Sequence, residues 1–157
     1  WRMSVESIEA EKGLNLSGIA IPFLAFLGMG ISGYLTYVKL GHKVAVCAGI
    51  GNCEIVQNSR YSEILGIPIA LLGFGLYVTI LVLWAWGRRP DAWMAGEVPW
   101  ALFGLSLAGT LYSAYLTYLE IFVIRAICPW CLASAVVMTA LCALTAREIL
   151  SNQEAAN

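Results

Sequence analysis

The chain has 157 residues, of which 60% are hydrophobic and 12% are charged, and its formal net charge is −1. Because about a quarter of the residues in a soluble domain are charged, this composition argues against an isolated soluble domain and excludes intrinsic disorder. The nearly neutral charge offers no basic surface for nucleic acid, and the length allows one domain.

Charged residues divide the chain into four long uncharged windows. The windows cover positions 13–38, 64–87, 98–119 and 126–146. A transmembrane helix needs about 20 consecutive, mostly apolar residues, and each window is long enough. We therefore expect an all-α integral membrane protein, a four-helix transmembrane bundle with spans at about 14–38, 67–87, 99–121 and 128–146. Residues 1–13 and 148–157 are expected to be terminal tails.

The first window is too long for a cleavable signal peptide, and it ends in the aromatic stretch 33–37 where such a peptide needs small residues. Pro22 lies inside this window, and a membrane helix tolerates the resulting kink. A polar loop with Cys47 and Cys53 follows, and Pro68 lies near the start of the second window. We expect a surface loop with a short half-helix between spans one and two.

The chain carries signs of an internal repeat. Residues 32–40 resemble residues 113–121 at an offset of 81, and the same offset pairs Cys47 with Cys128. Shared apolar composition is the simpler explanation, but the matching cysteines favour a duplication. With four alternating spans, both cysteine regions lie at the same membrane face in either case. Two pairs of small residues four positions apart are predicted to allow close helix packing: Gly28 with Ser32, and Gly109 with Ser113.

The fourth window opens with the sequence Cys128-Pro129-Trp130-Cys131. Proline suits the first position of a helix, so Cys128 is expected at the helix N-terminus, where the helix dipole favours a thiolate. Cys131 is expected about one turn deeper, toward the bilayer. Cys142 lies well inside the same span and is expected to behave as a small apolar residue.

Three interpretations of the other four cysteines remain open: two structural disulfides, a Cys₄ zinc site, or a dithiol relay. Zinc sites prefer two pairs of closely spaced cysteines, with two to four residues between the members of each pair, whereas five residues separate Cys47 from Cys53. Structural disulfides do not require a C-x-x-C at the membrane boundary. A relay needs an exposed pair and a fixed pair beside the lipid, so the residues favour the relay and no metal. A lipid-soluble two-electron carrier such as a quinone is its natural acceptor.

Taken together, these motifs make the chain similar to the vitamin K epoxide reductase family, in its bacterial branch. The similarity covers about residues 14–147 as one four-span catalytic domain. It depends on the Cys47/Cys53 loop pair, on Ser59-Arg60-Tyr61 after the second cysteine, and on C-x-x-C at the head of the last span.

This resemblance implies roles for individual residues. Cys128 and Cys131 would form the redox centre beside a quinone, ubiquinone or menaquinone, with Cys131 nearest the ring. Cys53 would exchange with Cys128, and Cys47 with a secreted or periplasmic thioredoxin-fold partner of the DsbA kind. The residues expected near the quinone are Ser59, which would support the half-helix, and Val56, Tyr61, Leu65 and Trp130, which would line the pocket.

Two positions depart from the vertebrate pattern. Ile69 and Ala135 stand where vertebrate members carry Asn and Tyr, which favours quinone reduction coupled to disulfide formation over reduction of vitamin K epoxide. The alternatives are an unrelated quinone reductase of the DsbB type and a non-enzymatic membrane protein with a Cys₄ metal site.

The expected location is the bacterial cytoplasmic membrane, with the cysteines on the periplasmic face. Disulfide formation needs an oxidising compartment. The inner side would then hold five basic residues and the outer side four, which agrees only weakly with the positive-inside rule. The adjacent Arg88 and Arg89 on the inner side favour the same orientation.

Overall fold

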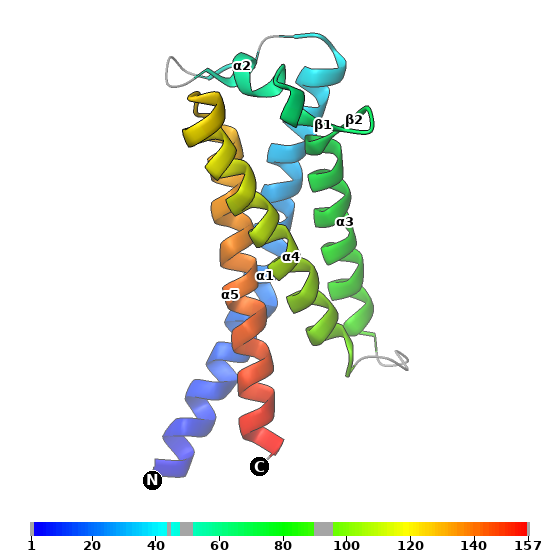
Figure 1. Cartoon of the computed structure of the whole chain (residues 1–157). Helices are drawn as coiled ribbons and strands as arrows, with labels where there is room; N and C mark the ends of the chain where they lie inside the picture. Colours follow the sequence, from blue (N-terminus) through cyan, green and yellow to red (C-terminus); the bar gives the residue numbers. More distant parts are fainter. Residues whose placement is uncertain (1, 44, 48–51, 90–95, 157) are drawn as a thin grey trace.

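The computed structural model describes residues 2–43, 45–47, 52–89 and 96–156, with side chains between 18 and 154. Its elements in chain order are α1 (Arg2–Leu40), α2 (Cys53–Gln57), the 3₁₀ turn η1 (Arg60–Ser62), β1 (Glu63–Ile64), β2 (Ile67–Pro68), α3 (Ile69–Gly87), α4 (Val98–Tyr118), the π-helical turn η2 (Leu119–Ile124) and α5 (Pro129–Ala156). Figure 1 shows the long helices α1, α3, α4 and α5, with α2, β1 and β2 gathered at one end and both chain termini toward the other.

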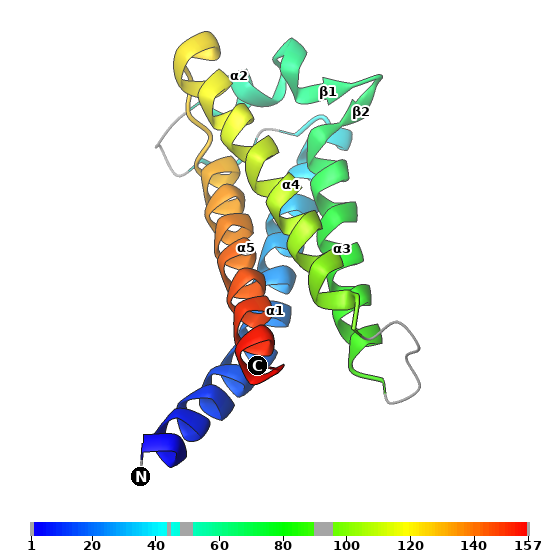
Figure 2. The same ribbon diagram turned by 60° about the horizontal axis from the view of Figure 1, so that its bottom comes forward.

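The four-helix membrane bundle predicted from the charge pattern is confirmed. Four helical stretches are long and apolar enough to cross a membrane: Gly18–Leu40, Ile69–Gly87, Val98–Ile124 and Pro129–Glu154. Helix continues into both segments predicted as terminal tails, because α1 begins at Arg2 and α5 ends at Ala156. The N-terminal part of α1 diverges from the other helices (Figure 2).

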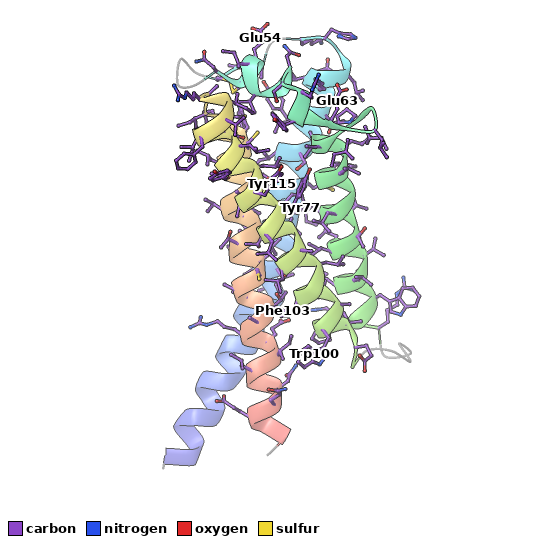
Figure 3. The ribbon with its side chains drawn as sticks, viewed as in Figure 1. Glu54, Glu63, Tyr77, Trp100, Phe103 and Tyr115 are labelled. Atoms are coloured by element: carbon purple, nitrogen blue, oxygen red, sulfur yellow. A yellow bond between two sulfur atoms is a disulfide. The ribbon has the colours of Figure 1, made fainter. Side chains whose placement is uncertain are left out.

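The bundle core forms where α1 packs against α3 and α5, and where α4 packs against α5 and α3. Tyr77 of α3 is fully buried in this core and donates a hydrogen bond of 3.0 Å to the carbonyl of Ser134 on α5. Figure 3 shows the Tyr77 side chain at mid-height in the bundle. The hydroxyls of Ser106 and Thr145 join α4 to α5 at 3.1 Å. These hydrogen bonds pair polar groups that would find no partner among the lipid tails.

Close helix contact depends on the small residues identified in the repeat. A Cβ atom added to Gly28 would lie 2.2 Å from the Tyr77 ring, and one added to Gly109 would lie 2.9 Å from Leu76 and Met138. Glycine at these two positions therefore lets α3 approach α1, and α3 and α5 approach α4. The packing role predicted for both residues is confirmed.

One end of the bundle is covered by the segment between spans one and two. It consists of the five-residue helix α2, the turn η1 and a two-stranded antiparallel hairpin in which Glu63 pairs with Pro68 and Ile64 with Ile67. Leu65 and Gly66 form the two-residue turn, both with positive φ, 53° and 80°. Figures 1 and 2 show this cap, residues 53–68, lying across the end of the bundle.

Candidate redox site

All four relay cysteines lie in one cluster at the capped end of the bundle. Cys53 and Cys128 are buried in its centre, at 1% and 0% exposure, and Cys47 and Cys131 pack against it. The other buried members are Val38, Ala45, Val56 and Ala126. Segments far apart in the sequence thus bring both cysteine pairs together at the same face of the bundle, as four alternating spans require.

The loop pair is oxidised in this structure, with Cys47 and Cys53 joined in a disulfide whose Cα atoms are 6.3 Å apart. Cys53 begins α2 and is buried, whereas Cys47 is half-buried. The loop is tied to the second pair through the backbone, because the Asn52 amide donates to the carbonyl of Ile127 at 3.2 Å. Cys47 is therefore the more accessible member of the loop pair, and Cys53 is the member held beside Cys128.

The second pair is reduced and lies at the start of the last span. Helix α5 begins at Pro129, and the Leu132 amide donates to the carbonyl of Cys128 at 3.1 Å in the first helical turn. A hydrogen bond from the Cys131 thiol lowers the pKa of Cys128 below its ordinary value, outweighing burial and the nearby charge of Glu120, which both raise it. Cys128 thus favours the thiolate, the form that attacks disulfides.

Trp130, which was expected near the quinone, contacts the Cys47 loop and is not part of the wall of the cavity described below. Its indole N–H donates to the carbonyl of Val46 at 3.0 Å, and its ring packs on Tyr34 with centroids 5.2 Å apart. The Val46 amide in turn donates to the Tyr34 hydroxyl at 3.1 Å. The residue before Cys47 is therefore held from both α1 and α5.

A cavity of about 430 Å³ lies beside the second pair, and its wall includes Cys131. This volume lies within the range of about 300–1,000 Å³ that is typical of ligand pockets. Most of the lining is apolar, from α1, α3, α4 and α5, and the cap closes one end. Three of the predicted pocket residues belong to the lining: Val56, Ser59 and Tyr61.

Hydrogen bonds fix the part of the cap that borders the cavity. Lys39 at the end of α1 donates to the Gln57 carbonyl, lies 3.3 Å from the Ser62 hydroxyl and forms an ion pair of 3.1 Å with Glu63. The Ser59 hydroxyl donates to the carbonyl of Val56 at 2.7 Å. Ser59 thus stabilises the end of α2.

Leu65, which was also expected near the quinone, lies outside the cavity wall. Its side chain is 98% exposed at the tip of the β1–β2 turn, and it is absent from the cavity lining. The positive φ of Leu65 and Gly66 reverses the chain at this point, so the tip points away from the bundle. Ile64 and Pro68, one on each strand, contribute to the cavity wall instead.

Two polar residues of the cavity wall escaped the sequence analysis. The amide nitrogen of Gln57 is buried and has no hydrogen-bond partner among the described residues. Glu120, 4% exposed, accepts the backbone N–H of Cys128 on its Oε2 atom at 3.1 Å. The internal repeat could have identified Glu120, because its offset of 81 pairs Glu120 with Lys39, and both residues line the cavity.

A membrane bundle that buries two cysteine pairs together, one on a loop and one at a helix start beside an apolar cavity, has the architecture of an oxidoreductase with cysteine redox pairs. Sequence comparison agrees, since the sequence model of the Vitamin K epoxide reductase family matches residues 19–146. The chain belongs to this family.

A similar curated protein is the Thiol-disulfide oxidoreductase LTO1 of Arabidopsis thaliana, which is 33% identical over 121 residues. The match covers 74% of this chain and 32% of that protein, so the chain spans about a third of the length of this relative.

Proposed function

We propose that this protein takes two electrons from the thiols of a thioredoxin-fold partner and passes them to a quinone in the membrane. Electrons would enter through Cys47 and Cys53 and leave through Cys128 and Cys131. The observation that carries the proposal is the shared cluster of the four cysteines, with Cys131 in the wall of an apolar cavity.

The position of each sulfur supports this order of transfer. Cys47 is half-buried and able to meet the thiolate of a partner, which would break the Cys47–Cys53 bond and release the Cys53 thiol. Cys53 lies buried in the same cluster as Cys128, so the two pairs can exchange a disulfide. The lowered pKa of Cys128 fits a sulfur that serves as both nucleophile and leaving group.

The cavity fits a quinone in both shape and polarity. A quinone combines an apolar ring and tail with carbonyl acceptors, and it takes up two electrons and two protons. The apolar wall would hold the ring and tail, while the buried Gln57 amide nitrogen, which has no partner in the described structure, would donate to a carbonyl. Cys131 would then lie beside the ring as its electron donor.

The location supported by this chemistry is a membrane between an oxidising and a reducing compartment. We propose the bacterial cytoplasmic membrane, with the cap and the four cysteines on the periplasmic side. Arg88 and Arg89 follow α3 at the end of the bundle opposite the cap, which is the cytoplasmic end in this orientation.

Both alternatives to this function have less support. An unrelated bundle of the DsbB type is excluded by the family match. A Cys₄ metal site needs four thiolates, whereas Cys47 and Cys53 are bonded to each other in this structure.

The proposal is tested by mixing the reduced protein anaerobically with ubiquinone and menaquinone analogues and following the quinone spectrum. We expect rapid quinone reduction by the wild-type chain and none by Cys131→Ser. Cys142→Ser is the matched control, because Cys142 is a free cysteine of the same helix outside the cavity wall, and it should keep the wild-type rate. Reduction that survives in Cys131→Ser would refute the proposal.

A further inference from the structure

Glu120 is a buried carboxylate that the electron path does not use. It lies inside the third membrane span with only 4% of its surface exposed. An ionisable residue within a membrane is costly, and it usually marks a function such as proton transfer.

The local backbone is organised around Glu120. The helix widens into the π-helical turn η2 at Leu119–Ile124, and such turns are frequent at functional sites. The carbonyl of Glu120 accepts the amides of Arg125 and Ala126, while Arg125 adopts the left-handed conformation with φ 54°. This turn carries the chain back toward α5 and directs the Glu120 side chain at the C-x-x-C.

The Glu120 carboxylate lies beside the second pair. Its Oε2 atom accepts the Cys128 amide at 3.1 Å. Glu120 and Cys131 also line the same cavity. The Glu120 carboxylate thus lies against the start of α5, beside the thiol that faces the cavity.

The surroundings leave this carboxylate able to take up a proton. The titratable and charged residues that line the same cavity are Lys39 on α1, Tyr61 in η1, Tyr77 on α3, Tyr112 on α4 and Cys131 on α5. Lys39, the one cation among them, forms its ion pair with Glu63. Within the described ranges no ion pair involves Glu120.

We propose that Glu120 is the catalytic proton acceptor for the Cys131 thiol when Cys128 and Cys131 close into a disulfide. Closure forms one S–S bond and releases two electrons and two protons from the two thiols. The Cys128 proton leaves as its thiolate forms, and the Cys131 proton passes to the Glu120 carboxylate. The electron acceptor rests on the proposed function, in which a quinone receives both electrons and, finally, both protons.

A purely structural role for Glu120 makes a different prediction. If Glu120 only held the Cys128 amide, Glu120→Gln would behave like wild type, because its side-chain carbonyl still accepts that N–H. Glu120→Ala would then be the only defective variant. A proton acceptor instead predicts that Gln and Ala are both defective.

Closure can be measured without any quinone, in a chain whose other three cysteines are serine. The reduced protein is mixed with dithiobis(nitrobenzoate), an aromatic disulfide. Its first release of coloured thiol marks attack by one cysteine, and its second marks ring closure by the other. We expect closure in Glu120→Gln to be slower by on the order of 100-fold near neutral pH, with a smaller difference at high pH where hydroxide removes the proton.

Glu97→Gln is the matched control, because it removes one exposed carboxylate just before α4, away from the cap, and it should close at the wild-type rate. Normal closure in this control also shows that the serine background folds. If the background fails to fold, closure is followed in the otherwise wild-type chain by mass spectrometry of the peptide with Cys128 and Cys131. Wild-type closure in Glu120→Gln, by either method, overturns the proposal.

The same variants mixed with a quinone separate this proposal from the proposed function. A wild-type chain that closes rapidly but never reduces quinone contradicts the quinone assignment and leaves the role of Glu120 intact. A wild-type chain that reduces quinone, with Glu120→Gln closing just as fast, contradicts only the role of Glu120.

Discussion

The side chains around Cys128 change the pKa of its buried thiol. Burial alone raises the pKa of a thiol, yet the hydrogen bond from Cys131 lowers the pKa of Cys128 below its ordinary value. Stabilising the thiolate favours the reduced pair and makes its disulfide a better oxidant. That property fits the proposed transfer of electrons from the loop cysteines to Cys128 and Cys131.

A pH profile tests this dependence on Cys131. Because the lowered pKa keeps Cys128 ionised at lower pH, its alkylation should begin at a lower pH than that of an ordinary thiol. Cys131→Ala removes the donor and should move the profile to higher pH. Cys131→Ser keeps a hydroxyl donor and should move it less. The rate is followed by mass spectrometry of the Cys128 peptide, and identical profiles for all three proteins would contradict this account.

At the residue scale, the sequence predicted where α5 begins, and it did not predict contacts that depend on the shape of the backbone. The C-x-x-C motif identified the start of α5 correctly because Pro129 has a strong positional preference. Leu65 was assigned to the pocket from its place in the chain, but the turn that exposes it follows from two positive φ angles. Trp130 binds Val46, a contact across 84 residues that no local pattern predicts.

The surroundings of Glu120 were also not predictable from the sequence, because they depend on contacts between helical elements. The third span was predicted at about 99–121, and helical structure continues through η2 to Ile124. The carboxylate is tolerated there because it accepts the Cys128 amide N–H. The long helices themselves were predictable, since lipid excludes charge from whole spans.

Helix packing provides a prediction at the scale of elements. Gly28→Ala should destabilise the bundle by about 1–3 kcal/mol, because the new methyl group overlaps the buried Tyr77 ring. Gly30→Ala is the matched control two residues further along α1, since its Cβ atom would meet nothing within 4 Å. Thermal unfolding in detergent should show a lower Tm for Gly28→Ala alone. Equal Tm values for the two variants would rule out the close α1–α3 contact.

The residues proposed for the redox reaction lie together at one end of the molecule. The cap, both cysteine pairs and the polar end of the cavity lie together, and Figure 3 shows Glu54 and Glu63 at this end and Trp100 near the opposite one. Four alternating spans force the ends of spans one and three to the same face, and this much follows from the sequence. How the loop folds back onto α5 depends on long-range bonds such as Asn52 to Ile127.

The most direct test is whether the inner cysteines of the two pairs bond to each other. In the Cys47→Ser/Cys131→Ser variant, the remaining cysteines are Cys53, Cys128 and Cys142. Because Cys53 and Cys128 share one buried cluster and Cys142 lies outside it, mild oxidation should form a Cys53–Cys128 disulfide, mapped by mass spectrometry of unreduced peptides. Persistent thiols at both positions, or a disulfide to Cys142 instead, would contradict direct exchange between the two pairs.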